Sequence, residues 1–197
     1  MSKFELLDSI YKKNNGFIRT ADVVANGISK TYFGEYIRER EFERVAHGIY
    51  MSKDTWGDEM YIIQARYPLA VFSHETASYL LNFAEREPIQ LAVTLRAGAN
   101  TTGLAKSGIK VYKVKTELFE EGLTTIQTPT GQTVRCYNAE RTLCDLVRSR
   151  KKIDIQELQS AVKAYMSNKE KNIPLLLRYA KSFNVEKIIR GYLEVLL

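Results

Sequence analysis

The chain has 197 residues, which at ~150 residues per domain allows one large domain or two small ones. Hydrophobic residues make up 45% and charged residues 26%, and this composition excludes a disordered, collagen-like or disulfide-dense protein. No apolar run approaches the ~20 residues that span a bilayer, and the first residues start an amphipathic helix rather than a signal peptide. We therefore expect a cytoplasmic protein that makes no use of a membrane.

Charge is distributed unevenly along the chain. The 29 Lys and Arg residues exceed the 23 Asp and Glu residues, for a net charge of +6 that permits nucleic acid as a partner without requiring it. Residues 1–53 carry 9 basic and 7 acidic side chains, residues 54–133 carry 7 and 9, and residues 134–197 carry 13 and 7. The excess thus lies at the C-terminal end. The two cysteines, Cys136 and Cys144, form no Cys-x-x-Cys pattern and indicate neither a disulfide scaffold nor a zinc ribbon.

The first fifty residues predict a winged helix-turn-helix. Helical spacing covers residues 2–13, a short extended piece follows at 16–18, and a brief helix at 21–26 stops at Gly27. Ser29 can cap the next helix, which continues to residue 40. Residues 42–51 then alternate between apolar and polar side chains on both sides of a His-Gly turn, a pattern typical of a β-hairpin. Two helices joined by a tight glycine turn and followed by a hairpin match this fold.

The helix that begins after Ser29 has two faces. Phe33 and Ile37 point to one side, and a small, polar stripe points to the other. In a winged helix this stripe would enter the major groove and the hairpin would meet phosphates or the minor groove. Glu35 on the stripe would repel phosphate, so it would contact a base amino group or hold a neighbouring arginine. The candidate DNA-binding residues are Ser29, Lys30, Thr31, Arg38, Arg44, His47 and Lys53.

The remainder of the chain predicts an α+β domain, residues 54–197, beside the winged helix of residues 1–53. A connecting helix covers residues 54–66 and ends at Pro68. The next part, to residue 137, is a mixed α/β lobe with a helix at 74–83 and a mostly antiparallel sheet. Its strands are expected at 69–73, 89–95, 109–115, 123–128 and 133–137. Residues 138–197 form a lobe that contains only helices, a C-terminal helical bundle.

Three constellations resemble chemical sites but are better explained by structure. Residues 98–107 have the wrong glycine-to-lysine spacing for a P-loop and are interpreted as a surface loop. Ser73 precedes His74 and Glu75 at a helix start, where we interpret it as an N-cap rather than a nucleophile. With two histidines in the chain, a site of several imidazoles cannot form. We expect no catalytic residues, no metal and no cofactor, and therefore not an enzyme.

A basic run follows the first C-terminal helix. Arg141, Asp145 and Arg148 share one helical stripe, and the simplest interpretation is an ion pair on the helix surface. Cys144 is interpreted as a small core residue. A second DNA-contact patch is a further hypothesis, alongside a plainly solvated face. Its residues are Arg148, Arg150, Lys151 and Lys152.

Three segments in this order resemble the AbiEi family, the antitoxin and repressor components of type IV toxin–antitoxin systems in abortive infection. They are residues 42–50 on the wing, residues 72–77 at the start of the second domain, and residues 140–145 in the first C-terminal helix. The resemblance implies phage resistance through an antitoxin that binds inverted repeats in its own operon promoter and represses transcription. It also implies that the protein counteracts a co-encoded nucleotidyltransferase-like toxin without requiring a stable complex with it.

Two functional hypotheses follow. The first is the autorepressing antitoxin just described, with double-stranded DNA as its partner. The alternative is a winged-helix protein-interaction module that binds a partner protein directly and has no sequence-specific DNA binding. The chain is not itself a nucleotidyltransferase of the toxin type, because it lacks a Gly-Ser followed by paired aspartates that hold Mg²⁺.

Overall fold

The computed structural model describes residues 2–196 and divides the chain into two compact units. The first unit is Met1–Pro68 with Gln127–Thr133, and the second is Leu69–Ile126 with Val134–Leu197. The first unit therefore extends past the boundary expected after Lys53. Hydrogen bonds explain the difference, because the Asp58 carboxylate accepts from Thr128 and Thr130 on the returning segment.

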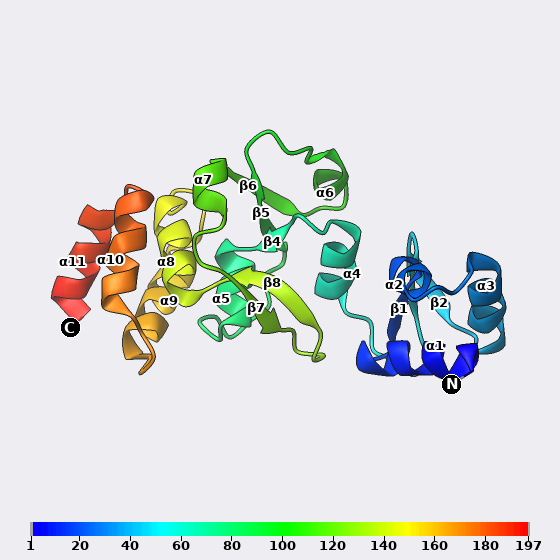
Figure 1. The fold of residues 1–197 in the computed structure, drawn as a ribbon. Helices are drawn as coiled ribbons and strands as arrows, with labels where there is room; N and C mark the ends of the chain where they lie inside the picture. The colour runs from blue at the N-terminus through cyan, green and yellow to red at the C-terminus, as the bar shows by residue number, and fades with distance from the viewer. Residues whose placement is uncertain (1, 197) are drawn as a thin grey trace. The chain divides into compact units, whose positions relative to one another are not determined.

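The described part of the first unit contains four helices and a three-stranded antiparallel sheet of order β1-β3-β2 (Figure 1). Helices α2 and α3 lie next to each other, joined by a turn in which Gly27 has a φ of +77°. The register of β2 against β3 shifts between Arg44 and Ala46. Its elements are α1 (Lys3–Lys13), β1 (Phe17–Arg19), α2 (Thr20–Ala25), α3 (Lys30–Glu39), β2 (Glu43–Ala46), β3 (Ile49–Met51) and α4 (Glu59–Arg66).

A small aromatic and aliphatic core holds these elements together. One buried side chain comes from α1, one from β1, and two, Phe33 and Tyr36, from α3. The Tyr36 hydroxyl lies at the edge of this core and donates a hydrogen bond to Asp8 Oδ1 at 2.7 Å. The core residues are Leu7, Ile18, Val23, Ile28, Phe33 and Tyr36. Their positions fix which face of α3 is left outside.

The second unit combines a five-stranded sheet of order β6-β5-β4-β8-β7 with helices. Strand β4 pairs antiparallel with β5, whereas β4 with β8 and β5 with β6 are parallel. The expectation of a mostly antiparallel sheet was therefore wrong, and the sheet is mixed. Its strands are β4 (Val71–Phe72), β5 (Ala92–Arg96), β6 (Lys110–Val114), β7 (Leu123–Gln127) and β8 (Thr133–Tyr137).

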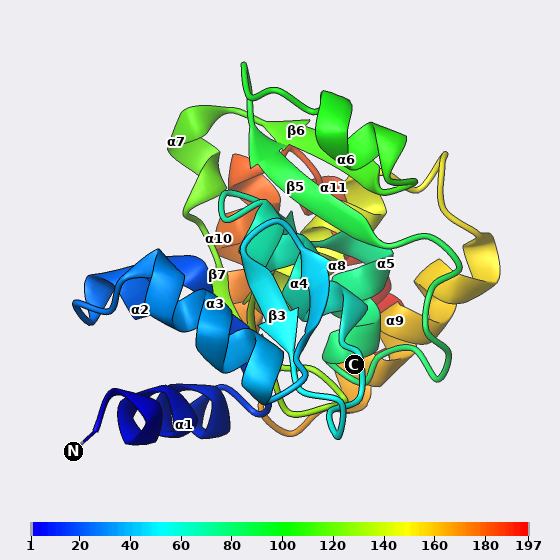
Figure 2. The same cartoon turned by 90° about the vertical axis from the view of Figure 1, so that its right-hand side faces the viewer.

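A short helix accounts for part of this difference. Parallel neighbours need a crossover connection, and the β5–β6 connection contains α6 (Thr102–Lys106), which contacts β6 (Figure 2). The sequence suggested that residues 98–107 form a surface loop throughout. This was wrong in part, because α6 lies within the segment. The other helices of the unit are α5 (His74–Leu80), α7 (Thr116–Phe119), α8 (Ala139–Arg148), α9 (Ile155–Ser167), α10 (Ile173–Ser182) and α11 (Glu186–Leu196).

The C-terminal helices were correctly predicted and form the larger core. Helix α8 lies at their centre and packs against α5, α9, α10 and α11. Leu143, Cys144, Leu146 and Val147 of α8 are all buried in it, so the assignment of Cys144 to the core is confirmed. Across residues 2–196 no helix combines the length and the apolar character needed to cross a bilayer.

Candidate nucleic-acid interface

The outward face of α3 carries the residues expected from the sequence. Ser29 is the N-cap, and its side chain accepts from the backbone N–H of Tyr32 at 3.3 Å. Lys30, Thr31 and Arg38 are exposed, because Phe33 and Tyr36 occupy the opposite, buried side of the helix. The predicted division of this helix into two faces is therefore confirmed. Gly34 and Glu35 are exposed on the same stripe.

The β2–β3 hairpin presents a second pair of polar side chains. Arg44 Nη2 donates to His47 Nδ1 at 3.0 Å, and both residues are exposed. Because an arginine side chain only donates, Nδ1 of His47 accepts, and its Nε2–H is left to donate elsewhere. Arg44 Nε also lies 3.4 Å from the carbonyl oxygen of Ala46. The contact therefore holds one cationic group and one additional donor together on the hairpin.

Lys53 is less available than the other candidates. Its ammonium lies 2.9 Å from the Glu41 carboxylate, and both side chains are exposed. Arg40, the C-cap residue of α3, is similarly paired with Asp8 at 3.0 Å. Arg38 and Lys30 make no ion pair or side-chain hydrogen bond to any residue the structure describes, so both cations of the α3 stripe are free.

The second basic run lies in the other unit and lines a pocket rather than a flat face. The pocket has a volume of about 550 Å³. Arg148 is partly buried there, and its Nη2 lies 3.2 Å from Asp145 Oδ1. We call this cavity the basic pocket; its lining residues are Thr101, Val111, Tyr112, Lys113, Arg148, Ser149, Arg150, Lys151 and Lys152. Thr101, Tyr112, Lys113 and Ser149 had no distinguishing sequence signal.

His74 lies buried near this pocket in a polar chain that the sequence did not suggest. Its Nδ1 is 3.0 Å from Ser73 Oγ, and its Nε2 is 3.1 Å from Ser149 Oγ. The ring stacks on Tyr112 with centroids 3.4 Å apart. Burial, followed by the charges of nearby Arg148 and other cations, holds the pKa of His74 well below 6.5.

This arrangement corrects the interpretation of Ser73. We expected Ser73 to act as an N-cap and bond the start of the helix through its side chain. Instead, His74 has a φ of +52°, and this unusual backbone turns its ring toward Ser73. Ser73 still occupies the N-cap position, but its side chain makes no capping hydrogen bond.

The ion pair on α8 is also not a surface feature. Arg141 and Asp145 are completely buried, with Arg141 Nε 2.9 Å from Asp145 Oδ2. Arg141 Nη1 donates to the carbonyl oxygens of Leu118 and Glu121, and its guanidinium lies 3.9 Å from the Phe183 ring centroid. The surface interpretation was therefore wrong. This pair holds α8 to the segment between β6 and β7 and is structural.

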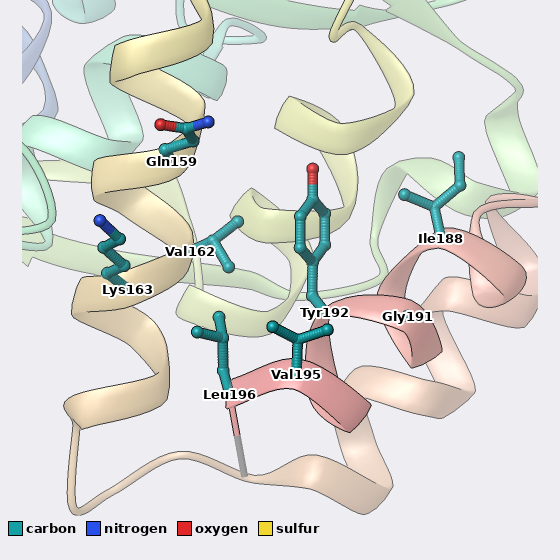
Figure 3. Close-up of a pocket in the computed structure, with 8 residues that line it drawn as sticks. All are labelled: Gln159, Val162, Lys163, Ile188, Gly191, Tyr192, Val195 and Leu196. Carbon is teal, nitrogen blue, oxygen red and sulfur yellow. The ribbon is translucent and has the colours of Figure 1, made fainter.

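A second cavity in the same unit is apolar. It lies between α9 and α11 and has a volume of about 570 Å³. Figure 3 shows the Tyr192 ring standing between the two helices, with Val162 facing it from α9. Among the described residues that line it, Lys163 alone is charged. This cavity therefore lacks the converging polar groups that would fix a charged ligand.

Neither a metal cluster nor a reactive thiol is evident among the described residues. No three His, Cys, Asp or Glu side chains within residues 2–196 are placed to hold a metal ion. Burial raises the pKa of both Cys136 and Cys144 to about 12, so each remains a protonated core thiol at neutral pH.

Comparisons with known proteins identify the fold alone. No protein-family model matches the chain, and no curated protein matches it in sequence. Among solved structures, it is similar to the crystal structure of the RV2827C protein from Mycobacterium tuberculosis, with a TM-score of 0.58. The two share 13% sequence identity over 92% of this chain and 72% of the other.

Proposed function

We propose that the chain is a DNA-binding autorepressor and the antitoxin of a type IV toxin–antitoxin system, and that its first unit is a winged helix-turn-helix. The observation that carries the DNA-binding part is the exposed stripe of α3 together with the Arg44–His47 pair. The order α1-β1-α2-α3-β2-β3 and the sheet order β1-β3-β2 support the winged-helix interpretation.

In this proposal α3 is the recognition helix. Its N-terminus combines the free backbone N–H groups of a helix start with Lys30 and Thr31, a combination that favours phosphate. Arg38, which is not held by a carboxylate, reaches a base edge or a phosphate farther along the stripe. Glu35 lies on the same face and accepts a hydrogen bond from a cytosine amino group, which favours DNA sequences that place a cytosine there.

The hairpin acts as the wing. Arg44 supplies charge for the phosphate backbone, and the Nε2–H of His47 supplies a second donor beside it. Lys53 contributes only after release from Glu41, so its loss weakens binding less than the loss of Arg44. Phosphate contacts of this kind give an affinity that falls steeply with salt.

The antitoxin part of the proposal rests on the resemblance of three segments to the AbiEi family. Two of them, residues 72–77 and 140–145, lie in the second unit and contain the buried His74 and the buried Arg141–Asp145 pair. We assign neutralisation of a nucleotidyltransferase-like toxin to this unit. Growth of cells that express the toxin encoded beside this gene tests the assignment, since the second unit must restore growth.

A protein-interaction module remains the second candidate, favoured by the weak net charge of residues 1–53. Fluorescence anisotropy with a labelled duplex from the region upstream of the gene separates the two. We expect Arg38→Ala and Arg44→Ala each to weaken binding about 10-fold, as the loss of a contact worth about 1–3 kcal/mol does, whereas Lys12→Ala on α1 changes it less than 2-fold. Equal affinity of all three variants, with a stable complex to a partner protein, would favour the module.

A further inference from the structure

The lining of the basic pocket is suited to an anion. Five of its nine residues are basic, and none is acidic. Arg148 is committed to Asp145, and Arg150 Nη1 donates to the carbonyl oxygen of Val147 at 3.1 Å. The ammonium groups of Lys113, Lys151 and Lys152 make no ion pair with any part of the chain that the structure describes. The pocket thus gathers positive charge that no internal partner neutralises.

A directed hydrogen-bond chain ends at the same pocket. Thr94 Oγ1 donates to Ser73 Oγ at 2.8 Å, so the hydroxyl proton of Ser73 is free for His74 Nδ1 at 3.0 Å. His74 is neutral and then carries its proton on Nε2, which donates to Ser149 Oγ at 3.1 Å. Ser149 Oγ is thereby used as an acceptor. Its own O–H, which faces no acceptor in residues 2–196, is available as a donor to a ligand in the pocket.

The remaining wall of the pocket is not charged. Val111 and Tyr112 come from β6, and Tyr112 is held in place by its stack on His74. A volume of about 550 Å³ falls within the 300–1,000 Å³ of small-molecule sites and far exceeds what one phosphate group fills. The shape and lining therefore suit an anionic group that carries a larger, partly apolar body.

We infer that the basic pocket binds a phosphate monoester of nucleotide size, with the Ser149 hydroxyl and the Lys151 and Lys152 ammonium groups as donors to the phosphate. The inference concerns the second unit and does not depend on DNA binding by α3 and the hairpin. It replaces a second duplex-DNA contact at Arg148, Arg150, Lys151 and Lys152 with a pocket for a discrete ligand.

Isothermal titration calorimetry of the full chain at low salt tests this inference with AMP, inorganic phosphate and a duplex as separate probes. We expect AMP to bind and Ser149→Ala to weaken it about 10-fold, as the loss of a hydrogen bond to a charged group does. Lys151→Ala combined with Lys152→Ala weakens it further. Lys187→Ala on α11, exposed and outside the pocket, is the matched control and leaves the affinity unchanged.

The three probes separate the sources of the phosphate. Tighter binding of AMP than of inorganic phosphate supports a nucleotide-sized ligand. Equal binding of both overturns the inferred size of the ligand, because the part of AMP beyond the phosphate then adds nothing. No heat with AMP or phosphate at millimolar concentration overturns the inference. It is also overturned if AMP binds the pocket variants as tightly as the wild-type chain. The same holds if the loss of the lysine charges weakens binding of the duplex and leaves binding of AMP unchanged.

Discussion

Acidification should destabilise the second unit through one buried imidazole, that of His74. The ring is completely buried, and this burial, followed by the charges of Arg148, Arg141 and Lys110, keeps its pKa well below 6.5. In the unfolded chain the same imidazole titrates near 6.5. Below that pH the unfolded state binds a proton that the folded state does not accept. Stability from this residue is therefore complete above about pH 7 and falls as the pH is lowered.

The size of the effect follows from proton linkage. At pH values between the pKa of His74 in the folded chain and its pKa in the unfolded chain, each unit of pH decrease lowers the free energy of unfolding by about 1.4 kcal/mol. Between pH 7.0 and pH 5.5 this amounts to about 1 kcal/mol, because the imidazole of the unfolded chain is only partly protonated at the start of the range. For a domain of this size such a loss is a measurable fraction of the total stability.

Urea denaturation, monitored by far-UV circular dichroism, measures this loss of stability at each pH. Most of the helical signal comes from the second unit, which contains α5 to α11. The fluorescence of Trp56 reports separately on the first unit, which contains α1 to α4. His74→Asn is the comparison variant, because asparagine tolerates a φ of +52° and does not titrate. Groups shared by both proteins, such as Asp145 with its raised pKa, cancel in the difference.

The prediction is that the wild-type chain loses about 1 kcal/mol more than His74→Asn between pH 7.0 and pH 5.5. The variant is less stable at pH 7.0, because it loses the ring stack and the bond to Ser149, but its pH dependence is flatter. Equal losses in the two proteins would mean that His74 accepts a proton in the fold, and would refute the proposed hydrogen-bond directions.

Two further predictions concern packing. Gly122→Ala should lower the free energy of unfolding by about 1–3 kcal/mol more than Gly108→Ala: both glycines have a φ of +76°, but a Cβ at 122 would lie 2.5 Å from Arg141 Cβ and one at 108 meets open space. Arg141→Leu should cost about 3–5 kcal/mol because it removes the buried partner of the Asp145 carboxylate and leaves that group with the longer contact to Arg148 at 3.2 Å, and adding Asp145→Leu should recover part of that loss. Urea titrations measure the free energy of unfolding in both cases. Equal free energies for the two glycine variants, or no recovery in the double variant, would contradict the packing described.

The exposed face of α3 could be predicted because it depends on local spacing. Phe33, Tyr36 and Ile37 follow helical periodicity, so the side opposite them had to face outward. The C-terminal helices were predictable for the same reason. Asn138, for example, caps α8 through a bond from the Arg141 N–H at 3.0 Å, as its position before an apolar stripe suggests.

The parts that failed depend on contacts between distant segments. The i,i+4 spacing of Arg141 and Asp145 is identical on a surface and in a core, and only the carbonyl groups contributed by other segments distinguish the two. His74 meets Ser149 across 75 positions of sequence. The parallel pairing of Phe72 with Cys136 is equally non-local. No short window of sequence around His74 or Phe72 contains its partner, and none around Arg141 contains the carbonyl groups of Leu118 and Glu121.

We propose that α3 and the β2–β3 hairpin recognise a specific DNA sequence. The most direct test is the ratio of the affinities for the region upstream of the gene and for a scrambled duplex of the same length, measured over a range of salt concentrations. We predict a ratio of at least ~10³, a steep fall of affinity with salt, and a slope that Arg44→Ala reduces by about one. A ratio near one, or a slope unchanged in Arg44→Ala, would contradict it.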